Sequence, residues 1–328
     1  MILFIIFSTV LLITLTYKLR SNFKLTASNK ETIPISVNFH FTRNCNYECG
    51  FCFHTAKNSA MPTLESSKVV LQKLSNAGMK KLNFAGGEPF LYPKYLQHLL
   101  RYSKQVLHLE SVSIVSNGSK ITKKFLDENK DYIDILAISC DSFDESTNIK
   151  IGRGKGNHVE KLKELSRWCK EYNIKFKLNT VVNKFNYFQD MNKHIEMIQP
   201  FRWKCFQVLI IDNENGGENT LRDARDFVIS DQEYDDFVKR HRRQKCMVVE
   251  GNKVMRNSYL ILDENLCFLN CQGNDKRPTE CLTNVDVSKA LIQAGWDQNS
   301  FSKRSGVYDW SKSSKPSCGG DNSKLLDW

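Results

Sequence analysis

Short apolar runs alternate with helical patterns along most of the chain, and this alternation constrains the fold more than any other feature. Amphipathic stretches or long crossovers follow the apolar runs ISVNFHF, KKLNFAG, SVSIVSN, DILAIS, KFKLNTVV and RWKCFQVLI. Six strands that are each followed by a helix imply a parallel sheet. No GxGxxG follows the first strand, which argues against a dinucleotide-binding unit. We therefore predict an α/β fold built as a partial (βα)6 barrel.

The stretches between these runs carry the signals of amphipathic helices. Apolar residues recur at helical spacing near 64–77, 158–172 and 188–198. At the start of the second stretch, Asn157 and Glu160 resemble a capping box, in which two side chains three residues apart accept each other's backbone N–H groups. We expect this helix to begin with such a cap.

The chain divides into three regions. Residues 1–34 hold an apolar segment and a polar linker, residues 35–250 hold the βα pattern, and residues 251–328 form an extension that we expect to cover the active site. The first 17 residues carry no charged side chain, and a few basic residues follow them. Because basic flanks stay on the cytosolic side, we predict a membrane anchor that leaves the rest of the chain in the cytosol. A cleaved signal peptide is the other interpretation.

Charge and cysteine content limit the class of partner. The formal net charge of +11 favours nucleic acid, a membrane surface or a phosphorylated small molecule. The densest basic run, KRHRRQK at 239–245, is typical of a solvated helix end, so we expect no direct nucleic-acid binding. The 11 cysteines are scattered except for one group, which indicates a reducing compartment. We expect Cys267, Cys271 and Cys281 to be packed thiols rather than ligands of a second cluster.

Cys45, Cys49 and Cys52 lie in RNCNYECGFCFH, straight after the first predicted strand. A closed zinc site or an ordinary iron–sulfur cluster takes four protein ligands, whereas a working site leaves one metal position open. The second strand runs into AGGEP at the same end of the sheet, and two glycines let a backbone approach a ligand closely. Active sites of parallel barrels gather at this end. The three thiols are therefore the predicted metal ligands.

The spacing CxxxCxφC, with Phe51 at the aromatic position, and the GGE after the next strand resemble the radical S-adenosylmethionine (SAM) superfamily. The resemblance implies that the three cysteines bind three irons of a [4Fe–4S] cluster and that SAM chelates the fourth. It also implies that the remaining cofactor contacts come from two groups of residues: Gly86, Gly87 and Glu88 would hold the SAM ammonium, while Ser116, Asn117, Ser139 and Arg153 would lie near its ribose or carboxylate.

Three predicted strands break the apolar pattern of a parallel sheet, whose strands are covered on both faces. By alternation, one face would carry four cations and two amides, and these strands carry no matching carboxylate there. Burying the cations requires an anion, and a polyphosphate is the natural counter-ion. The other interpretation is that the first cation of each strand reaches solvent at the barrel bottom. The residues concerned are Lys81 with Asn83, Lys177 with Asn179, and Arg202 with Lys204.

Nearly the whole chain resembles the viperin family of antiviral radical SAM proteins, on CNYECGFCFH, NFAGGEPF, SCDSFDE, RWKCFQ, SYLILDE and the LDW end. The resemblance implies a lyase that cleaves SAM to a 5′-deoxyadenosyl radical and dehydrates CTP to 3′-deoxy-3′,4′-didehydro-CTP, a terminator of viral RNA synthesis. Tyr259 would lie by the ribose as the candidate catalytic residue that returns a hydrogen atom. The triphosphate would be bound by Lys81, Lys177, Arg202 and Lys204, and the nucleotide positioned by Asn83 and Asn179.

Two alternatives stay open: a radical SAM enzyme acting on another nucleotide or a peptide, and a membrane-tethered scaffold acting by protein–protein interaction. The resemblance also implies the cytosolic face of the endoplasmic reticulum and of lipid droplets, with residues 1–17 on the membrane surface, and viral or host signalling proteins as partners. The terminal Leu326, Asp327 and Trp328 are expected to recruit the cytosolic iron–sulfur targeting machinery. Trp328 folding back over the active site is the other interpretation of this end.

Overall fold

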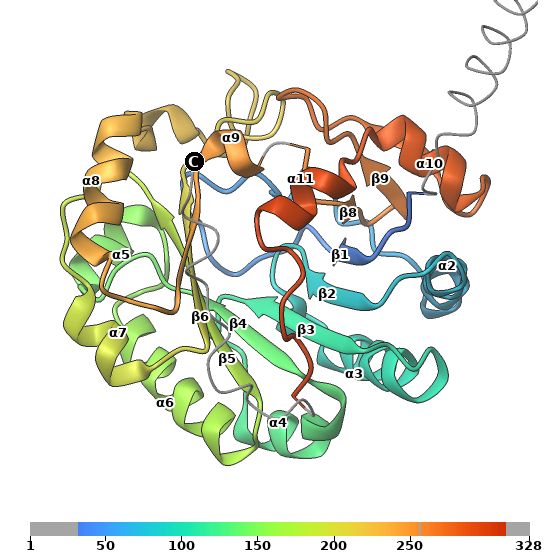
Figure 1. Cartoon of the computed structure of the whole chain (residues 1–328), viewed down its shortest axis with the longest axis horizontal. Coiled ribbons are helices and arrows are strands. Elements are labelled where there is room, and N and C mark those ends of the chain that lie inside the picture. Colours follow the sequence, from blue (N-terminus) through green and yellow to red (C-terminus); the bar gives the residue numbers. More distant parts are fainter. Residues whose placement is uncertain (1–31, 256, 313–328) are drawn as a thin grey trace, which may run out of the picture. The chain divides into compact units, whose positions relative to one another are not determined.

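Seven strands of the sheet run parallel in chain order, and they set where every functional side chain lies (Figure 1). The computed structural model describes residues 32–255 and 257–312, and its main compact unit begins at Ile33. The predicted anchor at 1–17 and the terminal Leu326, Asp327 and Trp328 lie outside the described residues. Within the described ranges, no helix is long and apolar enough to cross a membrane.

The six predicted strands are all present, and each is parallel to its neighbours. The sequence missed two further parallel strands, β7 (Met247–Glu250) beside β6 and β8 (Ile261–Leu262) on the far side of β1. The strand order begins at β10 and ends at β7, so the predicted parallel α/β sheet is confirmed and is wider than six strands. The predicted strands are β1 (Ser36–His40), β2 (Lys81–Ala85), β3 (Ser111–Ser116), β4 (Ile135–Ser139), β5 (Lys175–Val182) and β6 (Arg202–Gln207).

Helices cover the outer face of the sheet, as Figure 1 shows. The core lies between them and the outward side chains of the strands, such as Phe39, Leu82 and Leu178, which have no exposed surface. Burial of these apolar side chains against the helices fixes which face of each strand points inward. The helices that follow strands β1 to β6 are α2 (Leu64–Asn76), α3 (Pro93–Arg101), α4 (Lys123–Asn129), α5 (Glu145–Ile151), α6 (His158–Glu171), α7 (Asn192–Ile198) and α8 (Asp231–His241).

The start of helix α6 differs from the predicted capping box. Its N-cap is Asn157, as expected, but the Asn157 side chain makes no capping hydrogen bond. Instead, the carboxylate of Glu145 from the preceding helix α5 accepts the N–H of Val159 at 2.6 Å. A tertiary contact has therefore replaced the local cap, which a pattern confined to neighbouring residues cannot reveal.

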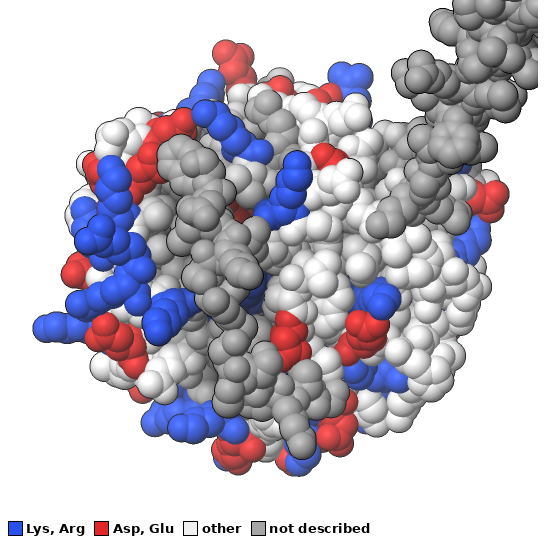
Figure 2. Space-filling model, in the orientation of Figure 1, with Lys and Arg blue, Asp and Glu red and all other residues white. Residues whose placement is uncertain are grey.

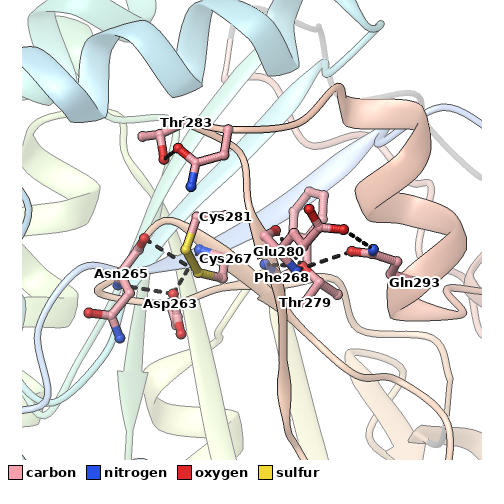
Figure 3. The surroundings of a disulfide bond; sticks show 10 residues. Asp263, Asn265, Cys267, Phe268, Thr279, Glu280, Cys281, Thr283 and Gln293 are labelled. Atoms are coloured by element: carbon pink, nitrogen blue, oxygen red, sulfur yellow. Dashed lines mark hydrogen bonds between the residues drawn. A yellow bond between two sulfur atoms is a disulfide. The ribbon is translucent and has the colours of Figure 1, made fainter.

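The C-terminal extension begins with a small antiparallel addition to the sheet, in which β9 (Cys267–Leu269) pairs with β10 (Pro278–Cys281). The register places Cys281 opposite Cys267, and the two form a disulfide (Figure 3). The expectation of packed thiols is thus wrong for this pair, because the hairpin register was not visible in the sequence. Cys271 is a free buried thiol, as expected. The other elements of the extension are α9 (Asn252–Met255), α10 (Val287–Ala294) and α11 (Gln298–Lys303).

Residues 304–312, which we term the strap, cross the sheet at the starting ends of its strands (Figure 1, red). The Ser111 hydroxyl at the start of β3 donates to the Trp310 carbonyl at 2.9 Å, and Lys175 at the start of β5 forms an ion pair with Asp309 at 3.0 Å. Trp310 is buried and packs edge-on against Tyr308. The strap therefore covers this end of the inner face.

Candidate active site

The cysteine loop follows β1 at the finishing ends of the parallel strands. Cys45 is exposed, Cys52 is half-buried and Cys49 is buried. Two backbone bonds of 3.0 Å, from Glu48 to Gly152 and from Gly50 to Ile151, hold the loop against the end of α5. Gly152 has φ +87°, and a Cβ there would stand 2.4 Å from the Glu48 carbonyl oxygen. This glycine is therefore required for the loop to dock.

The three thiols form an electrostatically coupled group. Burial, with smaller contributions from Asp141 and the neighbouring thiols, raises the pKa of Cys49 to about 12, and burial also raises the pKa of Cys52. Cys49 and Cys52 donate to separate backbone carbonyls, those of Gly152 and His54. Accordingly, no group of three or more His, Cys, Asp or Glu side chains is drawn together as a metal site within the described ranges. Three soft sulfur donors on one loop fit an iron–sulfur cluster with an open iron, and binding would release their protons.

The loop after β2 is joined directly to the cysteine loop. The backbone N–H groups of Gly87 and Glu88 donate to the carbonyls of Thr42 and Asn44, each at 2.7 Å. Gly86 has φ +131°, and a Cβ on Gly87 would stand 2.0 Å from the Asn44 carbonyl oxygen. Only glycine fits at both positions. The two glycines thus place the GGE backbone beside the thiols, where a role in binding the SAM ammonium stays a prediction.

The Glu88 carboxylate links this loop to the end of β3. It accepts hydrogen bonds from the Ser116 hydroxyl and the Asn117 N–H, each at 2.7 Å, and from the Phe90 N–H at 3.0 Å. Glu88 is fully buried, which raises its pKa to about 7, and these hydrogen bonds oppose the shift. Both carboxylate oxygens therefore have protein partners, so Glu88 positions the loop through its side chain.

Two of the other predicted cofactor residues also meet the cysteine loop. The Asn117 amide donates to the Cys45 sulfur at 3.7 Å. Arg153 is buried in an ion pair with Asp141, and although burial opposes it, Asp141 and the Cys49 thiol raise the Arg153 pKa. Ser139 ends β4 beside them, with its carbonyl 2.8 Å from Nε2 of His158. Contacts of these residues with the ribose or carboxylate of SAM remain predictions.

The predicted cations and amides do share the inner face. The register places Lys177 between Ala137 and Arg202, and Asn179 between Ser139 and Lys204, while Asn83 lies opposite Asn38 of β1. The idea that the first cations reach solvent is wrong for Lys81, which is 4% exposed. Its ammonium donates to the Tyr308 hydroxyl at 2.9 Å, and Arg202 lies over the Tyr308 ring at 4.2 Å. The strap thus closes the end at which these side chains would have met water.

Two charged residues of the inner face were missed by the sequence. Glu250, at the end of β7, is fully buried and forms ion pairs with Lys204 and Arg304. It supplies, from the unpredicted strand β7, a carboxylate that the three predicted strands lack on this face. Arg304, at the start of the strap, also lies over the Tyr259 ring at 3.9 Å. The apolar pair before Glu250 in MVVE was the available signal for a strand, whereas nothing near Arg304 indicated its position.

Basic side chains outnumber their acceptors on this face among the described residues. Within the described part of the chain, Lys177 has no hydrogen bond or ion pair, and burial, together with Lys204, Lys81 and Arg202, lowers its pKa well below the usual value. The Nε atoms of Arg202 and Arg304 are buried without a partner, as is the amide oxygen of Asn179. Burial lowers the pKa of Lys81 to about 7, and Arg202 adds to the effect. The unpaired donors fit the predicted anion site.

Tyr259 lies at the edge of this site, where its hydroxyl forms hydrogen bonds with one basic and one acidic side chain. Its hydroxyl accepts from Lys204 at 2.7 Å and donates to Glu250. Burial raises its pKa well above the usual value. The phenol proton therefore points at a carboxylate in this structure.

A parallel α/β sheet with three thiols after β1 and a glycine-rich loop after β2 defines a radical SAM protein. The model of the radical SAM superfamily matches residues 39–198. Among solved structures, Streptococcus suis SuiB bound to S-adenosylmethionine superposes with a TM-score of 0.61 at 16% identity, over 82% of this chain and 67% of that one. AnSMEcpe with bound AdoMet gives 0.60 at 16% identity, over 81% and 83%. At these identities the likeness establishes the fold alone.

Curated relatives define the family more narrowly. The S-adenosylmethionine-dependent nucleotide dehydratase RSAD2 of Siniperca chuatsi is 52% identical over 85% of this chain and 80% of that protein, and that of Danio rerio is 51% identical over 86% and 79%. A dehydratase of the same description from Flammeovirga pacifica is 34% identical over 86% and 98%. The chain belongs to this family of S-adenosylmethionine-dependent nucleotide dehydratases. As in the radical SAM superfamily generally, its cofactors are SAM and a [4Fe–4S] cluster.

Replacing Gly87 with Ala should impair cluster assembly, because the new Cβ would collide with the Asn44 carbonyl and push the cysteine loop away. We expect iron bound after anaerobic reconstitution to fall at least about twofold, measured by iron and sulfide analysis. The matched control is Gly217→Ala, where the nearest atom would be 3.6 Å from the new Cβ. Equal iron content in both variants would contradict the assigned role of Gly87.

Proposed function

We propose that this protein is a radical SAM dehydratase that converts CTP to 3′-deoxy-3′,4′-didehydro-CTP. The observation that carries the nucleotide triphosphate is the gathering of basic side chains on the inner face, above all Lys177, which has no hydrogen bond or ion pair in the described part of the chain. Five cations converge there against Glu250, and a triphosphate carries about four negative charges above pH 7. Burying such a surplus is costly without an anion. The cations are Lys81, Lys177, Arg202, Lys204 and Arg304.

The direction of the strands supports the orientation of the nucleotide. Lys81 and Arg202 begin β2 and β6, whereas the cysteine loop follows the finishing end of β1. Phosphates bound at the starting ends would direct the sugar toward the cysteine loop. Asn83 and Asn179 lie two residues further along their strands than Lys81 and Lys177, so their amides would meet the sugar or base.

Each set of residues then has a task in the dehydration. When bound at Cys45, Cys49 and Cys52, the cluster and SAM supply the radical that removes a hydrogen atom from the sugar. The cations hold the phosphates and so fix the sugar, because a triphosphate with several contacts has little freedom to turn. The buried amides orient the nucleoside, and the strap excludes water from the phosphate end. Tyr259 remains the candidate hydrogen donor, provided that its hydroxyl turns away from Glu250.

The choice of CTP follows the resemblance to the viperin family, and the amides on the inner face are compatible with other bases. A scaffold function alone would not require an unpartnered lysine on the inner face of the sheet. We also propose attachment to the cytosolic face of the endoplasmic reticulum and of lipid droplets through residues 1–17. The C-terminal Leu326, Asp327 and Trp328 are proposed to recruit the iron–sulfur targeting machinery.

The substrate is tested by reconstituting the protein anaerobically with iron and sulfide and adding SAM, dithionite and one nucleoside triphosphate at a time. We expect 5′-deoxyadenosine and a nucleotide lighter by one water, both dependent on CTP, by mass spectrometry. Equal deoxyadenosine with every nucleotide would contradict the choice of CTP. If none of the nucleoside triphosphates gives a dehydrated product, the proposed dehydratase activity is contradicted.

Lys177→Gln should weaken CTP binding at least about tenfold, because a charge-assisted contact to a phosphate contributes about 1.5–3 kcal/mol. The measurement is isothermal titration calorimetry on the reconstituted protein, with iron content as a check of the cofactor site. Lys193→Gln, on the exposed side of α7, is the control for loss of one charge. Loss of iron together with affinity would make Lys177 a structural residue.

CTP binding should take up protons near pH 8. The pKa of free Lys81 is about 7 and that of Lys177 lies well below its usual value, so both are mostly neutral at that pH, and a bound phosphate would raise both pKa values and recharge them. Affinity should therefore be greatest near pH 7 and fall as the pH rises, while the phosphates keep a constant charge. Calorimetry in two buffers of different ionisation enthalpy measures the uptake, and Lys81→Met should reduce it. Proton release in the wild type would contradict this assignment.

A further inference from the structure

Glu250 places a negative charge inside a site that is otherwise built for an anion. It lies at the end of β7 with no exposed surface. One carboxylate oxygen accepts from Lys204 and, at 3.4 Å, from Arg304, and the other accepts the Tyr259 hydroxyl. Burial raises its pKa, but Lys204 and Arg304 outweigh burial and hold the pKa below the usual value. The carboxylate is therefore ionised beside the proposed phosphate site, where it repels the ligand.

The register places Glu250 away from the phosphate end. It lies opposite Phe206, which follows Lys204 by two residues and Arg202 by four along β6. Because β6 and β7 run parallel, Glu250 is nearer the finishing ends of the strands, and so nearer the cysteine loop, than Arg202 or Lys81. It stands level with the region where the sugar of the nucleotide would lie.

The contacts of Glu250 fix the two side chains that face this region. Tyr259 is held from both sides, since its hydroxyl donates to Glu250 and accepts from Lys204 at 2.7 Å. Lys204 in turn donates to both Tyr259 and Glu250. Without the carboxylate, the phenol would lose its acceptor, and Lys204 would be free to move toward the phosphates.

We propose that Glu250 is a positioning residue of the dehydration, which holds Tyr259 and Lys204 at the sugar and weakens triphosphate binding in doing so. This inference rests on the proposed function. It requires affinity and productive turnover to change in opposite directions when the charge is removed. A residue that only supported the fold would lower both.

The test is Glu250→Gln, compared with wild type in the reconstituted protein. CTP should bind at least about threefold more tightly by calorimetry, because a repulsive charge is gone. The amount of dehydrated nucleotide per 5′-deoxyadenosine should fall at least about threefold, because Tyr259 and Lys204 are no longer held. Glu128→Gln, on the exposed side of α4, should change neither quantity.

A second variant keeps the proposal testable if Glu250→Gln folds poorly. Glu250→Asp retains the charge but shortens the reach to Tyr259, so it should leave CTP affinity within about twofold and still lower the product ratio. Tyr259→Phe should lower the product ratio without tightening binding, and adding it to Glu250→Gln should cause no further loss of that ratio, because coupled residues are not additive.

The outcomes separate this inference from the proposed function. If CTP does not bind to the wild type, the proposed function fails first. If CTP binds and is dehydrated by the wild type, but Glu250→Gln binds it more weakly or keeps the product ratio, the role of Glu250 is overturned. A parallel fall in affinity and melting temperature in both Glu250 variants would make Glu250 a structural counter-ion.

Discussion

Among the described residues, more basic than acidic side chains lie on the inner face of the sheet, and the rest of the structure accommodates this surplus. Lys81, Lys177 and Arg202 lie where a parallel sheet normally holds apolar side chains. The sheet tolerates them because the outer face supplies the core and because the strap covers the starting ends of the strands with Tyr308 and Trp310, whose rings lie 4.7 and 5.3 Å from the Lys81 ammonium. Aromatic faces and one carboxylate reduce the cost of burial without removing it. The remaining cost is what an anionic ligand would relieve.

The end of the sheet that carries the cysteine loop and the GGE loop is organised by backbone contacts rather than by charge. The cysteine loop and the GGE loop lie so close that a Cβ on Gly87 or Gly152 would overlap a carbonyl oxygen. Such contacts fix the loops before any ligand binds, and the Glu88 carboxylate extends the arrangement to β3. The thiols themselves are neutral and separately bonded. The loop frame is therefore prepared, while the thiols must lose their protons when metal binds.

The sequence predicted what periodicity and spacing can encode. Alternation in KKLNFAG, KFKLNTVV and RWKCFQV correctly placed the six polar residues on one face, because an inverted register would bury the charges against the helices. It failed where position depends on segments far apart in the chain. Glu250 lies on a strand of four residues and Arg304 follows a short helix, so neither belongs to a pattern long enough to recognise. The cap of α6 and the pairing of Cys267 with Cys281 failed for the same reason, since both depend on tertiary contacts.

Basic side chains occupy two different environments in this protein, the hydrated outer surface and the inner face of the sheet. The basic run KRHRRQK spans the end of α8 on the outer surface, where Lys and Arg gather in Figure 2. These charges are hydrated, and some of them form ion pairs with Asp236 and Glu196. The inner cations differ because burial lowers their pKa and leaves some without acceptors. Net charge alone would not distinguish the two groups. A phosphate would gain little at the hydrated surface, where water already solvates each cation, whereas at the inner face it would replace missing partners. A preference of an anion for the inner face would therefore arise from burial rather than from the total charge of the chain.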